Sequence, residues 1–192
     1  MEAPARRIVL FVSGTGSNAR VMIDRFQDHP DDGVAVVLLV SNRASAPALL
    51  MAAERGIPTL VIDRPYFYGS EQIVADLAHF RPDYLVLAGF LWLVPAYLVR
   101  AFPDRIVNIH PALLPKYGGK GMYGAHVHRA VHAAGEAESG ITIHYVNERY
   151  DEGAYIRQER VALDPEDSPE EIGRKVLGLE HRWYWEVVRA LP

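Results

Sequence analysis

A neutral hydrogen-bond donor, Asn108, and a titratable imidazole, His110, lie two positions apart, directly after an apolar run that is typical of a strand. Residues two apart in an extended chain point to the same side, so both groups can reach one reacting atom. Pro111 and Pro115 favour a stiff turn that holds them still. An amide and an imidazole placed in this way suit two tasks, stabilising negative charge on a carbonyl oxygen and moving a proton.

A carboxylate that pairs with His110 is available in the polar stretch from Asn147 to Gly153, which separates two late apolar runs. We expect Asp151 to be that partner, raising the pKa of His110 and fixing its ring. By pattern alone, a surface turn is the more common explanation for Asp151.

A small-residue loop, Ser13 to Ala19, joins the first apolar run to the first expected helix. Glycines let the backbone approach a ligand, and a helix N-terminus offers free N–H groups to an anion. The loop fits the dinucleotide pattern G-x-G-x-x-A, but Ser41-Asn42-Arg43 stands where that pattern needs an acidic residue, which weakens a nicotinamide site. A tight turn without a ligand remains an alternative.

Three histidines, His126, His128 and His132, include an H-x-H pair and an i, i+4 pair. No H-E-x-x-H motif and no acidic residue accompany them, so we expect polar packing or substrate contacts and no metal. The nearby Gly118–Gly124 loop is either a lid with a phosphate contact through Lys120 or a surface insertion.

Composition narrows the classes of function. The 192 residues are 49% hydrophobic and 23% charged, an ordinary globular balance. A net charge of −4 without a basic run favours neither nucleic acid nor an anionic membrane. The absence of cysteine excludes disulfides, Cys-ligated zinc and a thiol nucleophile. The uncharged stretch from Tyr84 to Val99 is too short for a membrane helix and is interrupted by Gly89 and Pro95. No signal peptide is visible, so we expect a cytoplasmic enzyme.

Alternation of apolar runs with amphipathic segments predicts an α/β fold: a Rossmann-like open sheet, mostly parallel, with helices on both faces and a late antiparallel extension. We expect a single domain over 1–192. The expected strands span 8–12, 34–40, 59–62, 84–88, 106–109, 140–146 and 154–161, and the expected helices span 19–26, 46–55, 70–80, 126–134 and 169–189, with a further helix after the turn near Gly89.

Together these segments resemble the phosphoribosylglycinamide formyltransferase family, the folate-dependent transformylases of purine synthesis. The resemblance covers nearly the whole chain. It rests on Ser13-Gly14-Thr15-Gly16-Ser17-Asn18, Leu87-Ala88-Gly89-Phe90, Asn108-Ile109-His110-Pro111 through Tyr117, Gly140-Ile141-Thr142-Ile143-His144, Asp151-Glu152-Gly153 and Glu180-His181.

The resemblance implies transfer of a formyl group from 10-formyltetrahydrofolate to the amine of glycinamide ribonucleotide, without a metal. It makes Asn108, His110 and Asp151 the catalytic set: we expect Asn108 and protonated His110 to donate hydrogen bonds to the formyl oxygen, and Asp151 to keep His110 charged and to relay protons. It assigns nucleotide binding to Gly16, Ser17, Asn18 and Glu180. It assigns folate binding to Leu91, Trp92, Leu93 and Val94, together with Asn147, Glu148, Arg149 and Tyr150.

Two positions depart from the family pattern. Trp92 stands where the family usually carries an arginine, and Tyr66 to Ser70 offers no clear match to the arginine that meets the outer part of folate. Alternatives are formyl transfer to another amine, such as an amino sugar nucleotide or methionyl-tRNA, hydrolysis of formyl-folate, and a non-catalytic nucleotide-binding module. The sequence leaves the oligomeric state open, a homodimer included.

Overall fold

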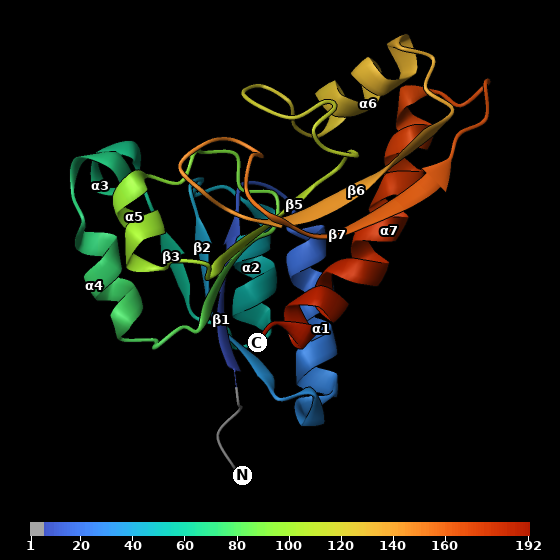
Figure 1. Ribbon diagram of the computed structural model, residues 1–192. Coiled ribbons are helices and arrows are strands. Elements are labelled where there is room, and N and C mark those ends of the chain that lie inside the picture. The colour runs from blue at the N-terminus through green and yellow to red at the C-terminus, as the bar shows by residue number, and fades with distance from the viewer. Residues whose placement is uncertain (1–5) are drawn as a thin grey trace.

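Within residues 6–192, which the computed structural model describes, seven strands form one sheet in the order β3-β2-β1-β4-β5-β6-β7 (Figure 1). The first five strands pair in parallel, and β6 and β7 extend the sheet as an antiparallel pair. The strands are β1 Arg6–Val12, β2 Val34–Ser41, β3 Thr59–Val61, β4 Tyr84–Leu87, β5 Ile106–His110, β6 Glu138–Tyr145 and β7 Tyr155–Ala162.

Helices cover both faces of the sheet. In Figure 1, α3, α4 and α5 lie on the left of the sheet, and α1 and α7 lie on the right. The helices are α1 Ser17–Asp28, α2 Pro47–Glu54, α3 Arg64–Gly69, α4 Gln72–Ala78, α5 Ala96–Ala101, α6 Ala125–Ala133 and α7 Pro169–Ala190, with a 3-10 turn, η1, at Pro30–Asp32.

Two buried apolar clusters follow from this layering. Along β1, Ile8 and Leu10 pack toward α1, α2 and α7, whereas Val9 and Phe11 pack toward α3, α4 and α5. Successive strand residues point to opposite faces, so a strand covered on both sides must be apolar throughout. The uninterrupted apolar run of β1 has this physical cause.

The expected fold class is confirmed, and most element boundaries differ from the expected ones by one or two residues. The short helix α3 lies outside the expected elements. Asp63 caps it, because its carboxylate accepts a hydrogen bond from the Tyr66 N–H, and Pro65 stands in its first turn. These local signals were present in the sequence, but the segment is too short to show a helical period.

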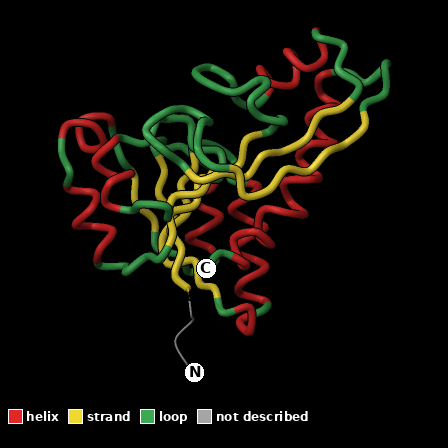
Figure 2. Tube along the Cα trace, in the orientation of Figure 1, coloured by secondary structure: helices red, strands yellow, loops and turns green. Residues whose placement is uncertain are grey.

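The loops that follow β1, β4 and β5 gather at one end of the sheet, opposite the end at which β1 begins (Figure 2). β1 pairs with β2 on one side and with β4 on the other. The connections that follow the neighbouring strands β1 and β4 therefore run to opposite faces of the sheet, and a crevice opens between them. Ligands of open α/β sheets bind in such a crevice.

Candidate active site

A cavity of about 730 Å³ occupies this crevice. It joins the small-residue loop after β1 to the loop after β4 and the end of β5. Its lining includes Gly14 to Asn18, Leu87 to Val94, Asn108 to Pro111, Gly119 to Gly124, His128, His144, Val146, Arg149 to Asp151, Gly173, Leu177 and Glu180.

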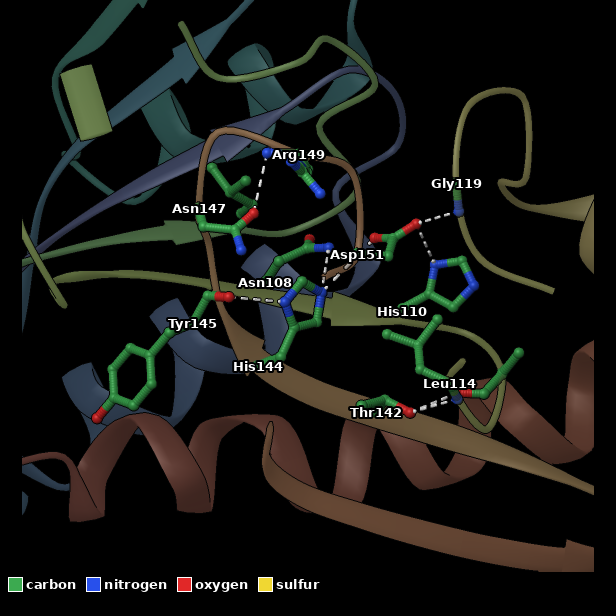
Figure 3. Close-up of polar contacts among 12 residues, drawn as sticks. Asn108, His110, Leu114, Gly119, Thr142, His144, Tyr145, Asn147, Arg149 and Asp151 are labelled. Carbon is green, nitrogen blue, oxygen red and sulfur yellow. Dashed lines mark hydrogen bonds and ion pairs between the residues drawn. The ribbon is translucent and has the colours of Figure 1, made fainter. Parts of the chain in front are cut away.

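Asn108 and His110 both line this cavity from β5, as their two-residue spacing predicts. Asp151 reaches the same place from the loop between β6 and β7 (Figure 3). Its Oδ2 atom lies 3.6 Å from Nδ1 of His110, and the imidazole itself is 3% exposed. The expected contact between the imidazole and the carboxylate is therefore present.

Asp151 raises the pKa of His110, as expected, but the net shift is downward, so the expectation that His110 is held in its charged form is wrong. Burial lowers the pKa of His110 below its ordinary value, although Asp151 and the backbone carbonyl of Tyr117 act in the opposite direction. That carbonyl accepts a hydrogen bond from Nε2 of His110 at 2.7 Å. Desolvation of the charged form outweighs the nearby carboxylate, so the resting imidazole is neutral near pH 7.

Asp151 is held by three groups. The backbone N–H of Gly119 donates to its Oδ2 at 2.9 Å, and its Oδ1 lies 3.6 Å from Nε2 of His144. Burial raises the pKa of Asp151, but opposing effects, among them the nearby His110 and the hydrogen bond from the Gly119 N–H, outweigh burial and hold the pKa below its usual range. The carboxylate is therefore charged at neutral pH and faces two imidazoles.

His144 orients Asn108, a role that the sequence patterns did not assign. Its Nδ1 donates to the carbonyl of Tyr145 at 2.9 Å, so in the neutral ring Nε2 accepts from the Asn108 amide at 3.2 Å (Figure 3). One amide N–H is thereby fixed and the other is left for a ligand. Because β5 and β6 pair Asn108 with His144, only the antiparallel register reveals this contact.

Gly153 lets the loop that carries Asp151 close against β6. A Cβ atom at this position would lie 1.6 Å from the Tyr145 carbonyl oxygen and 3.5 Å from Nδ1 of His144. Any larger residue must therefore displace the backbone that orients His144.

The loop after β1 turns at Gly16, whose φ is +70° and whose added Cβ would lie 2.6 Å from Cβ of Ala48. Gly16 is also the N-cap of α1, so Ser17 and Asn18 open that helix toward the cavity. Asn18 donates through Nδ2 to Glu180 on α7, and its buried Oδ1 has no hydrogen-bond partner within residues 6–192. Burial raises the pKa of Glu180, against the effect of the Asn18 hydrogen bond. The four residues expected to bind a nucleotide therefore lie together at one end of the cavity.

Leu91 to Val94, in the loop after β4, line another part of the cavity. The Leu91 N–H donates to the buried Ser13 hydroxyl at 2.9 Å, which ties the loop after β4 to the loop after β1. Arg64, at the start of α3, places its guanidinium 5.0 Å from the Trp92 ring centre. A cation thus stands beside Trp92, a contact that only the position of α3 reveals.

Only part of the loop between β6 and β7 lines the cavity. Arg149 and Tyr150 line the cavity, whereas the side chains of Asn147 and Glu148 are not among its lining. Asn147 accepts a hydrogen bond from the Arg149 N–H, and Glu148 forms an exposed ion pair with Arg100 at 3.5 Å. These two expected folate residues are therefore not brought into the cavity.

The three clustered histidines have separate surroundings. His126 packs its ring edge against Tyr123, His128 lines the cavity beside Gly173, and Nδ1 of His132 contacts the carbonyl of Asp167. Among residues 6–192, no group of three or more metal-binding side chains is arranged around one point. Lys120 lines the cavity with the rest of its loop. No helix in the described part of the chain is both long and apolar enough to span a membrane.

Comparisons with known proteins agree with this arrangement. The formyl transferase family matches residues 6–188. The phosphoribosylglycinamide formyltransferase of Haemophilus influenzae is 34% identical over 96% of this chain and 86% of its own. The crystal structure of glycinamide ribonucleotide transformylase 1 from Symbiobacterium toebii superposes with a TM-score of 0.87 at 31% identity, covering 98% of this chain and 88% of that one.

A plant relative is longer than this chain. The chloroplastic phosphoribosylglycinamide formyltransferase of Arabidopsis thaliana is 44% identical over 99% of this chain, which spans 66% of that protein's length. The family match and the shared fold cover the loop after β1, the end of β5 and the loop that carries Asp151. The chain belongs to the formyl transferase family.

Proposed function

We propose that this protein transfers the formyl group of 10-formyltetrahydrofolate to the amine of glycinamide ribonucleotide, a step of purine synthesis. The observation that carries the proposal is the convergence of Asn108, His110 and Asp151 on one cavity that also reaches the loop after β1. The names of the relatives and solved structures support formyl transfer to this acceptor.

Asn108 stabilises the charge that develops during transfer. Attack of the substrate amine on the formyl carbon forms a carbon–nitrogen bond and places negative charge on the formyl oxygen. The Asn108 N–H that is not bonded to His144 donates to this oxygen. Because the donor is already oriented, it adds no reorganisation cost, and one such donor is worth about 3 kcal/mol.

His110 accepts a proton as the reaction proceeds. Its neutral resting form can take the proton that the attacking amine loses, and the charged Asp151 at 3.6 Å stabilises the resulting imidazolium. Collapse of the intermediate breaks the bond to N10 of the folate, and N10 receives the proton. A base and acid of this kind contributes about 10²–10⁴ in rate.

The two ends of the cavity take the two substrates. Gly16, Ser17 and Asn18 offer backbone N–H groups and a free amide oxygen to the phosphate and ribose, and Glu180 contacts the ribose hydroxyls. The backbone of Leu91 to Val94 and the loop with Arg149 and Tyr150 hold the pterin. Trp92 and Arg64 lie where the outer, carboxylate-bearing part of the donor leaves the cavity.

The test compares two histidine variants in a spectroscopic assay with both substrates. We expect His110→Ala to lower kcat by about 10²–10⁴. His132→Ala is the control, because the exposed His132 contacts the carbonyl of Asp167 and is not part of the cavity lining, and we expect the rate of this variant to be unchanged. Absence of turnover by the wild type, or normal turnover by His110→Ala, contradicts the proposal.

We also propose that residues 1–192 act as a single formyltransferase domain in the cytoplasm. The continuous sheet and the family match over 6–188 support the single domain. A homodimer remains a proposal to be tested by the mass of the protein in solution. Another acceptor, such as an amino sugar nucleotide, is tested in the same assay by exchanging the amine.

A further inference from the structure

A second, smaller cavity lies beside the turn after β5, apart from the lining of the candidate active site. Its volume is about 220 Å³, and it is lined by the turn, by residues of α6 and the segment after it, and by the β6–β7 hairpin. β5 pairs with β6 only as far as the His110–Thr142 pair, so within residues 6–192 the start of β6 has no strand partner on this side. Leu113, Leu114 and Val131 provide an apolar wall.

Two ion pairs also line this cavity. Nζ of Lys116 lies 2.7 Å from Oε1 of Glu136, and the guanidinium of Arg160 pairs with the carboxylate of Glu138. The charges of the two cations and the two carboxylates sum to zero. A ligand that carries both charges can form charge-assisted hydrogen bonds with one cation and one carboxylate at once.

We propose that this cavity binds a free α-amino acid, with its ammonium group at Glu136 and its carboxylate at Arg160. The apolar wall accommodates the aliphatic part of such a ligand. The volume is smaller than the roughly 300–1,000 Å³ of sites for drug-sized molecules, which restricts the ligand to a small metabolite.

Tyr117 connects this cavity to the candidate active site. Its phenol donates to Oε1 of Glu136 at 2.8 Å, while its backbone carbonyl accepts from Nε2 of His110 at 2.7 Å. Its φ of 57° lies in the left-handed region, which a tyrosine adopts only when its surroundings hold it there. An ammonium group at Glu136 competes with the phenol, so occupancy of the second cavity is transmitted to the His110 ring.

Calorimetric titration of the protein with each of the twenty proteinogenic amino acids tests the site. We expect saturable binding of at least one, weakened about tenfold or more by Glu136→Gln. Glu159→Gln is the matched control, because Glu159 pairs with Arg157 at 2.7 Å on the same hairpin and does not line the cavity. The Glu159→Gln variant should bind the amino acid with the affinity of the wild type. If no amino acid binds, or if both variants lose affinity equally, the site is disproved.

The connection through Tyr117 has its own test. In an NMR spectrum of the imidazole nitrogens, the bound amino acid should shift the His110 resonances, and Tyr117→Phe should shift them in its absence. A His110 signal that neither change moves overturns the connection. Circular dichroism establishes that each variant is folded. Neither experiment uses formyl transfer, so their failure is distinguishable from failure of the proposed function.

Discussion

At the scale of single residues, the balance of forces on His110 decides the chemistry. Burial lowers its pKa, and the Asp151 carboxylate and the Tyr117 carbonyl recover part of that loss. The His110 imidazole therefore binds a proton more weakly in the folded protein than in the unfolded chain. The linked free energy stabilises the fold above the unfolded pKa and is lost as the pH falls below it.

The pH dependence of kcat/KM tests this balance. The proposed role of neutral His110 as proton acceptor predicts that the rate falls on the acid side, with an apparent pKa below the ordinary histidine value of about 6.5. Asp151→Asn removes a group that raises the His110 pKa, so this acid limb should move to still lower pH while most activity is lost. NMR titration of the ring measures the same shift directly. A profile that Asp151→Asn leaves unaltered refutes the pairing.

Sequence reasoning succeeded at this scale where neighbours in the chain carry the information. The spacing of Asn108 and His110 places both in the cavity because strand geometry is local. The role of His144 and the cation–π contact of Arg64 with Trp92 depend on strand register and on the position of a short helix. The sign of the His110 pKa shift required the degree of burial, which residue types alone do not provide.

At the scale of elements, the β6–β7 loop must close tightly to bring Asp151 to His110. Gly153 permits this approach because its backbone lies against the Tyr145 carbonyl. The alternation of strands and helices made the layered sheet predictable. The exact path of this loop was not, because it is determined by contacts with β6 rather than by any period in its own residues.

Two glycine-to-alanine substitutions distinguish two reasons for a glycine: close contact with a neighbouring backbone at Gly153, and the entropy cost of a glycine within a helix at Gly178. Gly153→Ala should lower the melting temperature and the activity together, because its Cβ displaces the segment that orients His144. Gly178→Ala, within α7, meets no atom within 4 Å and should stabilise the protein by about 0.4–1 kcal/mol. Thermal unfolding followed by circular dichroism measures both. A Gly153→Ala variant as stable and active as the wild type contradicts the packing argument.

At the scale of the whole molecule, the crevice joins elements from the two layers of helices. The end of the cavity proposed for the nucleotide is built by α1 and α7, which pack on one face of the sheet. The part proposed for the formyl donor is built by the loop after β4, whose Phe90 and Val94 pack with α3, α4 and α5 on the other face. The two proposed substrate sites therefore use elements from opposite faces of the sheet.

This separation predicts separable effects on the two substrates. Arg64→Ala should raise the KM for a donor with glutamate carboxylates and leave the KM for the nucleotide unchanged, since Arg64 lies beside Trp92. Arg189→Ala, which removes an exposed ion pair with Asp32, is the control. Steady-state kinetics with each substrate varied in turn gives both constants, and an equal rise in both after Arg64→Ala would argue against the assignment.

The fate of a ¹³C-labelled formyl group tests the central claim most directly. NMR of the protein with labelled 10-formyltetrahydrofolate and glycinamide ribonucleotide should show the label leave N10 and appear on the nucleotide amine. His110→Ala should slow this transfer without diverting it. Label that accumulates as formate, or that stays on the donor with wild-type protein, contradicts the account.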